Sequence, residues 1–328
     1  MRIKKQGQIR KNKLMALKKK TILVAGGAGF IGSHLCDVLL TQGHFVIALD
    51  NLITGSRKNI AHLAKHKRFK FIKADVSKVT KIKADEIYHL ASPASPPYFQ
   101  KYAIEIFKAN IWGAYNLLEL AKKNKARMLF ASTSEVYGQP LQHPQKETYF
   151  GNVNTVGIRS CYDESKRAAE ALCMDYHRKF GVDLKIIRIF NTYGPRMFKN
   201  DGRVVSNFIT QALAGKPLEI YGNGRQTRSF QYVDDLVSGI VKMMASPKTF
   251  IGPVNLGNPN EFTIIELAKK VLRLTGSKSK LIYKALPKDD PRQRKPDISL
   301  AQKKLKWKPM VNLEAGLSRT IHYFKGVI

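Results

Sequence analysis

The sequence contains few cysteines and no long apolar run. Its three cysteines, Cys36, Cys161 and Cys173, are an odd number without C-x-x-C spacing in a chain of 328 residues. This usage argues against a disulfide framework or a zinc site, so we expect buried free thiols and no bound metal. No segment reaches the roughly 20 apolar residues of a membrane span. Residues 1–20 are basic and lack the apolar core of a secretory signal, and we therefore expect a cytoplasmic protein.

Acidic residues are also scarce. The 24 Asp and Glu stand against 57 Lys and Arg, which gives a formal net charge of +33. Such an excess is typical of proteins that bind nucleic acids or anionic membranes. Here the basic residues are spread along the chain, and no helix-turn-helix, zinc-knuckle or RNA-binding motif occurs. The one basic cluster lies in residues 1–20, which we predict to be a mobile tail. We expect an acidic small molecule as the partner, and neither nucleic acid nor a membrane.

Short apolar runs alternate with helical segments through residues 21–193. This alternation predicts an α/β fold of the Rossmann type, with a doubly wound parallel sheet and helices on both faces. The predicted strands span residues 21–25, 45–50, 69–72, 87–90, 128–131 and 184–189, and the predicted helices span about 30–41, 104–124 and 162–180.

The alternation ends beyond residue 193. Turn sequences such as Gly222-Asn223-Gly224 separate short helical pieces at 204–214, 234–244 and 264–274. Residues 194–328 therefore form mainly a smaller, irregular α/β substrate lobe, with a segment near 230–256 that can return to the first domain. The substrate cleft is expected between the two lobes, beyond the carboxyl ends of the strands.

A glycine-rich turn directly follows the first predicted strand and opens a helix. Gly26, Gly29 and Gly32 satisfy G-x-x-G-x-x-G, which lets the backbone approach a pyrophosphate at the helix N-terminus. Asp50 ends the second strand, where a carboxylate can bind an adenosine ribose and repel a 2′-phosphate. The pattern predicts NAD as the cofactor in preference to NADP. Further contacts are expected from Phe30 and Ile31 of the turn and from Asp75 and Val76 after the third strand.

A second motif, Y-x-x-x-K, opens the helix predicted at 162–180. Tyr162 and Lys166 lie on one helix face at this spacing. A lysine cation and a nicotinamide cation nearby would lower the tyrosine pKa from its ordinary value of about 10. The phenolate could then accept a proton from a sugar hydroxyl. Thr133, which follows a buried strand, completes a Thr-Tyr-Lys set.

Together these motifs resemble the extended short-chain dehydrogenase/reductase family, and within it the UDP-glucuronate decarboxylases (UDP-xylose synthases). The resemblance extends from about residue 21 to residue 324. The segments that carry it are GGAGFIGSHL, YHLASPASPP, ASTSEVYG, SCYDESKR, RIFNTYGPRM, DGRVVSNFI, GRQTRSFQYVDDLV, NLGNPNEFTI and DDPRQRKPDI. The resemblance also implies cofactor contacts from Asn51, Thr54, Gly55, Leu90 and Ser92.

The resemblance implies NAD-dependent decarboxylation of UDP-glucuronate to UDP-xylose and CO2 through a 4-keto intermediate, with NAD regenerated in each cycle. Tyr162 would be the base for the C4 hydroxyl, Lys166 would hold the nicotinamide ribose, and Thr133 would hydrogen-bond the C4 oxygen. Ser134 and Glu135 would act in decarboxylation and protonation. The family further implies a homodimer, in which the helices at 104–124 and 162–180 of both subunits form a four-helix interface.

Basic residues should line the site of a substrate with two phosphates and a carboxylate. The resemblance assigns Arg228 to the pyrophosphate and Arg294 to a second substrate contact. It names as weaker candidates Lys108, Asn191 and Arg203, with Phe208 and Tyr221 for the uracil pocket.

Two alternatives remain open. One is a nucleotide-sugar 4-epimerase or 4,6-dehydratase of the same family, against which Ser134 and Glu135 argue. The other is a basic NAD-binding regulatory or nucleic-acid-associated protein, against which the retained Tyr162 and Lys166 argue.

Overall fold

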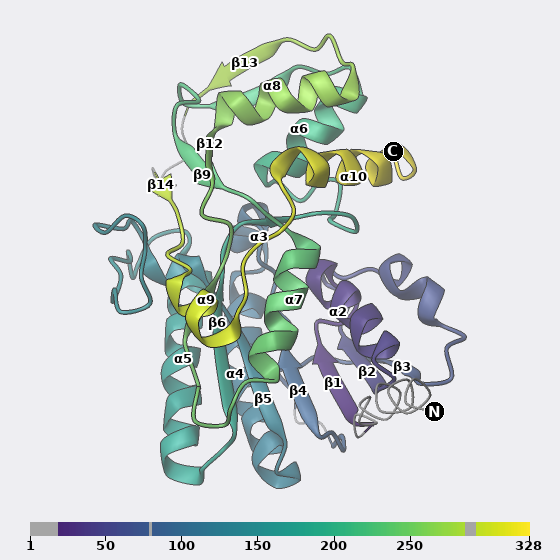
Figure 1. Ribbon diagram of the computed structural model, residues 1–328, viewed down its shortest axis with the longest axis vertical. Helices are drawn as coiled ribbons and strands as arrows, with labels where there is room; N and C mark the ends of the chain where they lie inside the picture. The colour runs from purple at the N-terminus through teal and green to yellow at the C-terminus, as the bar shows by residue number, and fades with distance from the viewer. Residues whose placement is uncertain (1–18, 79–80, 286–292) are drawn as a thin grey trace, which may run out of the picture.

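The structure, a computed structural model, describes residues 19–78, 81–285 and 293–328. The basic cluster predicted as a mobile tail lies in residues 1–20 and is almost wholly outside the described residues. The described chain folds into a larger lobe around a central sheet and a smaller lobe above it (Figure 1).

The larger lobe is built on seven parallel strands in the order β11–β6–β5–β4–β1–β2–β3. Its inner strands are apolar along their length because helices cover both faces of the sheet. From β1 the chain first moves outward through β2 and β3, then returns to β4 on the other side of β1 and continues through β5 and β6. This reversal places a crevice at the carboxyl ends of β1 and β4. The strands are β1 (Thr21–Ala25), β2 (Phe45–Asp50), β3 (Phe69–Lys73), β4 (Glu86–His89), β5 (Arg127–Thr133), β6 (Leu184–Ile189) and β11 (Val254–Leu256).

Two helices cover each face of this sheet. The helices α2 (Phe30–Thr41) and α7 (Val233–Met244) pack together on one face, and α4 (Ala103–Asn124) packs along α5 (Ser160–Phe180) on the other (Figure 1). Each pair buries its own apolar cluster against the strands. The predicted doubly wound α/β fold is therefore confirmed. Shorter helical segments are η1 (Arg57–Leu63), α3 (Pro96–Lys101), η2 (Ser134–Tyr137) and α9 (Ser299–Leu305).

The smaller lobe combines three helices with short strands. Its helix α8 begins at a capping box between Thr263 and Glu266 and ends at Gly276, whose φ of 71° suits glycine. The helices predicted at 204–214 and 264–274 occur within one residue of those bounds, whereas the short strands offer too few residues for a period to be read from the sequence. The elements are α6 (Val204–Leu213), α8 (Ile264–Thr275), α10 (Leu313–Lys325), β7 (Thr192–Tyr193), β8 (Leu218–Tyr221), β9 (Thr227–Ser229), β10 (Gln231–Tyr232), β12 (Glu261–Thr263), β13 (Leu281–Lys284) and β14 (Gln293–Arg294).

The three cysteines are free thiols on helices. Cys36 and Cys173 are buried and Cys161 is half-buried. Among the residues that the structure describes, no helix is both long and apolar enough to cross a membrane.

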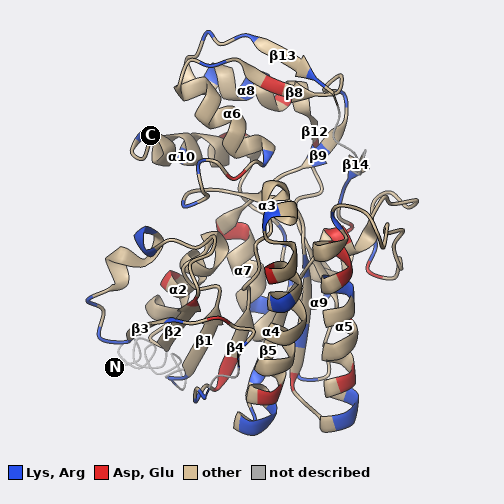
Figure 2. Cartoon of the chain, turned by 180° about the vertical axis from the view of Figure 1, so that it is seen from behind, with Lys and Arg blue, Asp and Glu red and all other residues tan. Residues whose placement is uncertain are grey.

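Lys and Arg residues are spread over both lobes (Figure 2). A group of them lies at the lower ends of α4 and α5, and these are the carboxyl ends of both helices. Cations there interact favourably with the negative end of the helix dipole. Part of the positive charge thus has a local structural role in the helices that carry it.

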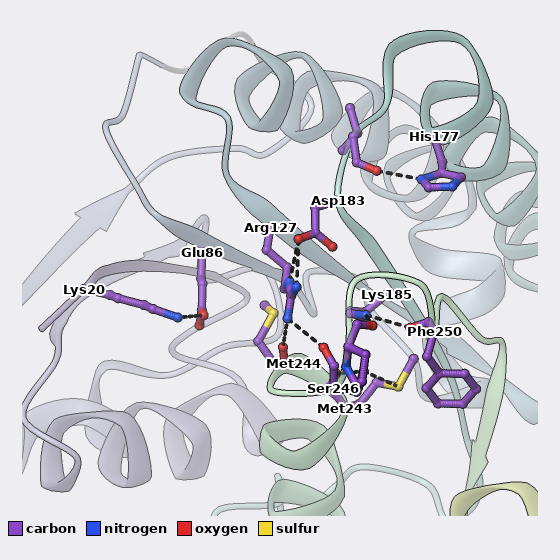
Figure 3. A network of polar contacts seen from close by, with 12 residues as sticks. Lys20, Glu86, Arg127, His177, Asp183, Lys185, Met243, Met244, Ser246 and Phe250 are labelled. Atoms are coloured by element: carbon purple, nitrogen blue, oxygen red, sulfur yellow. Dashed lines mark hydrogen bonds and ion pairs between the residues drawn. The ribbon is translucent and has the colours of Figure 1, made fainter. Parts of the chain in front are cut away.

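Two cations at the amino ends of β5 and β6 hold the segment that returns from the smaller lobe (Figure 3). Arg127, the first residue of β5, donates to the carbonyl oxygens of Met244 (2.7 Å), the last residue of α7, and of Ser246 (2.9 Å), two residues further on. Its guanidinium pairs with Asp183 at 2.8 Å. Lys185 is buried beside it and donates to two carbonyl oxygens, one of them that of Phe250, at 2.6 Å. Burial lowers the pKa of Lys185 to about 8. These bonds satisfy the last carbonyls of α7 and join the α7–β11 connection to β5 and β6.

We expect Arg127→Ala to lower the free energy of unfolding by about 2 kcal/mol, because it leaves two carbonyl oxygens and Asp183 without their charged donor. Urea unfolding followed by circular dichroism measures the change. Arg178→Ala is a suitable control, because its pair with Asp175 is exposed and should contribute almost nothing. Equal effects of the two substitutions would contradict this role of Arg127.

Candidate active site

A cavity of about 1270 Å³ lies between the two lobes. Residues at the carboxyl ends of the parallel strands, including Gly26, Asp50, Leu90 and Thr133, form one wall, and the smaller lobe supplies the opposite wall through residues such as Arg228. The cavity is thus in the position that the chain reversal at β1 and β4 predicts for a ligand.

The glycine-rich turn has the close packing that a phosphate cradle requires. A Cβ atom on Gly32 would lie 2.0 Å from the carbonyl oxygen of Gly26, so no side chain fits there. Gly26 has a φ of 84°, which other residues rarely adopt. No side chain caps the N-terminus of α2, which begins after Gly29, and its first turn contains no acidic residue. The free N–H groups of this helix end can therefore bind a pyrophosphate.

Asp50 lies at the end of β2, beside this turn. Its carboxylate accepts hydrogen bonds from the backbone N–H groups of Ala28 (3.0 Å) and Leu52 (2.8 Å). Burial raises the pKa of Asp50, and these donors oppose that effect. A carboxylate oriented in this way retains lone pairs for ribose hydroxyl groups, so the turn and Asp50 fit an adenine dinucleotide.

The other residues predicted to bind the cofactor line the same cavity. Asp75 accepts hydrogen bonds from Asn51 (3.2 Å) and from the backbone of Ser77 (2.8 Å), so the ends of β2 and β3 are joined. The complete set on the cavity wall is Gly26, Gly29, Phe30, Ile31, Gly32, Asp50, Asn51, Thr54, Gly55, Asp75, Val76, Leu90, Ser92, Tyr162 and Lys166.

Tyr162 and Lys166 face the cavity from the first turns of α5. The Lys166 ammonium donates to the carbonyl oxygen of Ala131 at 2.8 Å and lies 5.9 Å from the centre of the Tyr162 ring. Thr133, at the end of β5, is close enough to hydrogen-bond the phenol. The structure thus brings the predicted Thr-Tyr-Lys set together.

The expected lowering of the tyrosine pKa does not occur among these residues. Burial raises the pKa of Tyr162 to about 12, and the charges of Glu135 and Asp163 act in the same direction, against the Thr133 hydrogen bond. Burial also lowers the pKa of Lys166 to about 7. Burial disfavours both charged forms, and this outweighs the attraction between the two groups that the helical spacing suggested.

Glu135 lies on the same wall, in the short helix η2. Its carboxylate pairs with Arg159 at 2.5 Å and with Arg294 at 3.3 Å. Burial favours the neutral acid, but Arg294, Arg159 and Arg228 together outweigh it and hold the pKa of Glu135 below its ordinary value. Arg294 is itself buried and also donates to the backbone carbonyl oxygens of Ser134 and Gly138. Arg294 therefore binds the turn that carries Ser134 and Glu135.

All of the predicted substrate residues except Lys108 line the cavity. Among them, Arg203 is paired with Asp201, which also accepts a hydrogen bond from Ser95 at 2.6 Å. Those that line the cavity are Asn191, Arg203, Phe208, Tyr221, Arg228 and Arg294.

The prediction for Lys108 is wrong in this structure. Lys108 is exposed on α4 and does not line the cavity. The buried face of α4 near it passes through Ile106, Asn110 and Gly113, and Lys108 lies between these positions on the outer side.

Sequence reasoning missed two charged residues at this site. Arg159 lines the cavity one helical turn before Tyr162 and pairs with Glu135, and Asp163 follows Tyr162 and is buried. Their spacing from Tyr162 was the only available signal, and charged residues at the start of a helix are too common for it to be specific.

The chain was compared with known proteins. Residues 22–257 match the NAD dependent epimerase/dehydratase family. UDP-glucuronic acid decarboxylase 1 of Arabidopsis thaliana is 52% identical over 311 residues, which cover 95% of this chain and 71% of that protein. The enzyme of the same name from Xenopus tropicalis is 52% identical over 307 residues, 94% of this chain and 72% of that protein.

Solved structures give the same assignment of the fold. UDP-glucuronic acid 4-epimerase from Bacillus cereus, in complex with UDP-glucuronic acid and NAD, has a TM-score of 0.86 and 32% identity, and the match covers 94% of this chain and all of that one. UDP-glucose 4-epimerase from Thermotoga maritima has a TM-score of 0.86 and 30% identity, over 94% of this chain and 99% of that one.

The chain belongs to the NAD dependent epimerase/dehydratase family, and NAD is its cofactor. Within that family it groups with the UDP-glucuronic acid decarboxylases, as its sequence motifs indicated.

We expect the protein to bind NAD in preference to NADP and expect Asp50→Asn to reduce that preference. The substitution removes the charge that binds the ribose and repels a 2′-phosphate, so NAD affinity should fall about tenfold. Calorimetric titration with both cofactors measures the ratio. Asp85→Asn is a matched control, because Asp85 also accepts a backbone N–H, from Thr21 at 2.7 Å, outside the cavity. Equal affinity of the unmodified protein for both cofactors would refute this role of Asp50.

Proposed function

We propose that this protein converts UDP-glucuronate to UDP-xylose and CO2, with NAD regenerated in each cycle. The observation that carries the proposal is the 52% identity to UDP-glucuronic acid decarboxylases along 95% of the chain. The cavity adds support, because it joins a dinucleotide turn, the Thr133-Tyr162-Lys166 set and a cluster of arginines.

The first stage oxidises the sugar at C4. When bound, NAD+ supplies the hydride acceptor and a positive charge beside Tyr162. Tyr162 takes the proton of the C4 hydroxyl, and Thr133 hydrogen-bonds the same oxygen. Lys166 binds the nicotinamide ribose, and its ammonium is oriented by the carbonyl oxygen of Ala131. Because burial raises the pKa of Tyr162 to about 12, the phenolate depends on positive charge that enters the cavity.

The second stage removes the carboxylate. A ketone at C4 is β to the C6 carboxylate and accepts the electrons of the breaking C–C bond as an enolate, so CO2 can leave. C5 must then gain a proton. C4 must finally regain the hydride, and its oxygen the proton held by Tyr162, so that UDP-xylose forms and no cofactor is consumed. Glu135 and Ser134 stand on the wall next to Tyr162 and are the groups that we assign to this stage. Arg228 and Arg294 supply the positive charge that a substrate with two phosphates and a carboxylate requires.

A second candidate is 4-epimerisation of UDP-glucuronate with retention of the carboxylate. The likeness to the Bacillus cereus 4-epimerase favours it. The identity to that enzyme is 32%, against 52% to the decarboxylases, which favours decarboxylation.

We propose in addition that the protein is a homodimer joined through α4 and α5. The outer side of α4 exposes four large apolar side chains, Ile104, Phe107, Trp112 and Tyr115, and α5 exposes Phe180 near its end. Several exposed large apolar side chains on one pair of helices favour a subunit interface there.

The activity can be tested in one incubation of the purified protein with UDP-glucuronate in D2O. We expect release of CO2 and formation of UDP-xylose without net consumption of NAD. The product should carry one deuterium at C5, because the enolate is protonated from exchangeable groups. If the protein were a 4-epimerase, chromatography would separate UDP-galacturonate from the substrate, and no CO2 would be released.

Tyr162→Phe should lower kcat by about 10²–10⁴-fold, because it removes the proton acceptor and little else. NAD binding should be nearly unchanged. Tyr176→Phe is the matched control, since Tyr176 lies on the same helix and donates to Glu119 outside the cavity. A Tyr162→Phe variant with near-normal turnover would exclude Tyr162 as the base.

Sedimentation should show a dimer at micromolar concentration, and Trp112→Glu should shift the equilibrium toward monomer because it buries a charge at the interface. Lys306→Glu, on a surface remote from α4, should leave the dimer intact. A monomer in the unmodified protein at that concentration would refute this interface.

A further inference from the structure

Asp163 is a buried carboxylate with no role in the mechanism above. It follows Tyr162 on α5 but does not line the cavity, whereas Glu135 does. Both carboxylates contact the same guanidinium. Arg159 pairs with Glu135 at 2.5 Å through Nη2 and with Asp163 at 3.9 Å through Nε.

Arg159 is held between these two acids by an aromatic stack. Its guanidinium carbon lies 5.4 Å from the centre of the Phe99 ring, and that ring stacks on Tyr162 with the ring centres 5.1 Å apart. The arginine therefore has little freedom to leave either carboxylate.

The two carboxylates differ in the ion pairs and hydrogen bonds that they make. Glu135 has two short or moderate ion pairs, with Arg159 and Arg294. Asp163 has only the 3.9 Å contact, and its Oδ1 atom is buried without a hydrogen-bond partner among the described residues. An ionised carboxylate in that position is unfavourable, so the proton belongs on Asp163 when Glu135 is charged.

We propose that Asp163 is a positioning residue for Glu135, and that the two carboxylates share one proton and keep a single negative charge beside Arg159 and Arg294. Uptake of a proton by Glu135 is then compensated by ionisation of Asp163, so the arginines are never left without an anion. The inference rests on the proposed function, in which Glu135 gains and loses a proton around the loss of CO2.

The charged groups around Asp163 support this coupling. They are Arg159 and Glu164 on its own helix, Glu135 on η2 and Arg294 on β14. Burial and then the charge of Glu135 raise the pKa of Asp163, and the two arginines oppose them. Because Glu135 and Asp163 act on each other, they titrate as a pair. Cys161 and Tyr162 are further titratable neighbours, and Asp163 contributes to the raised pKa of each.

Infrared difference spectroscopy of the protein without substrate tests the shared proton directly. We expect the C=O stretching band of a buried protonated carboxyl group, which disappears as the pH rises through about 7. Asp163→Asn should abolish the band. Glu135→Gln should move its disappearance to lower pH, because the negative neighbour is lost. Asp175→Asn, an exposed aspartate on the same helix, should leave it unchanged. The absence of such a band in the unmodified protein would overturn the proposal.

Kinetics test the link to Glu135. In Asp163→Asn the uptake of a proton by Glu135 is no longer compensated, so its pKa falls. We expect kcat to fall about tenfold at neutral and alkaline pH for each unit by which that pKa decreases, with a smaller loss at acidic pH. KM for UDP-glucuronate should be unchanged, and Asp163→Glu should restore the pH profile in part. A loss that is the same at every pH would mean that Asp163 only supports the fold.

Thermal melting separates these effects from misfolding. When folding raises the pKa of an acid, the folded state loses stability as the pH rises from the pKa of that acid in the unfolded state through its pKa in the folded state. Asp163→Asn lacks this penalty and should melt at or above the unmodified protein at alkaline pH. A much lower melting temperature there would contradict the proposal. If the unmodified protein forms no UDP-xylose, the proposed function fails, while the infrared result still decides whether the two acids share a proton.

Discussion

Glu135 is bound by one arginine from each lobe, and much of the site depends on this arrangement. Arg159 reaches it from the start of α5 in the larger lobe, and Arg294 from β14 beside the smaller lobe. Arg294 is buried, and its guanidinium also satisfies two backbone carbonyl oxygens of the turn after β5. Removal of one partner of a buried ion pair leaves an uncompensated charge at a cost of several kcal/mol. The position of the second lobe and the shape of the turn after β5 are therefore stabilised together.

A second network connects the same turn to the segment that returns from the smaller lobe. The Tyr137 hydroxyl donates to Asn255 of β11 at 2.8 Å and accepts from Arg188 of β6 at 3.0 Å. Arg188 is in turn bound by both carboxylate oxygens of Glu170 on α5, at 2.7 and 2.9 Å. Bidentate pairs of this kind restrict orientation as well as distance. Strand β11 thus supports the geometry of η2 although it lies far from it in the chain.

Burial of side chains on the cavity wall determines their acid–base properties. Burial raises the pKa of Tyr162 to about 12 and lowers that of Lys166 to about 7, so both groups favour their neutral forms. Glu135 beside them remains ionised, because three arginines surround it and hold its pKa below the ordinary value. Such a site responds strongly to any charge that enters with a ligand, since Coulomb interactions are screened little in a medium of low dielectric constant. The charges of the cofactor and of the anionic substrate therefore shift the protonation of Tyr162 and Lys166 when these ligands bind.

The sequence by itself determined six of the seven strands of the sheet, the glycine turn and the Thr133-Tyr162-Lys166 set, because these depend on local periodicity and on motifs within single β-α-β units. It also placed helices α6 and α8 to within one residue. Only the tertiary structure decided three further points. Lys108 faces away from the cavity, since the orientation of α4 depends on what it packs against. The tyrosine pKa is raised by burial, which no spacing reveals. Arg159, Asp163 and Glu135 form one charge cluster because residues far apart in the chain converge where parallel strands end, and that convergence is a property of the folded sheet.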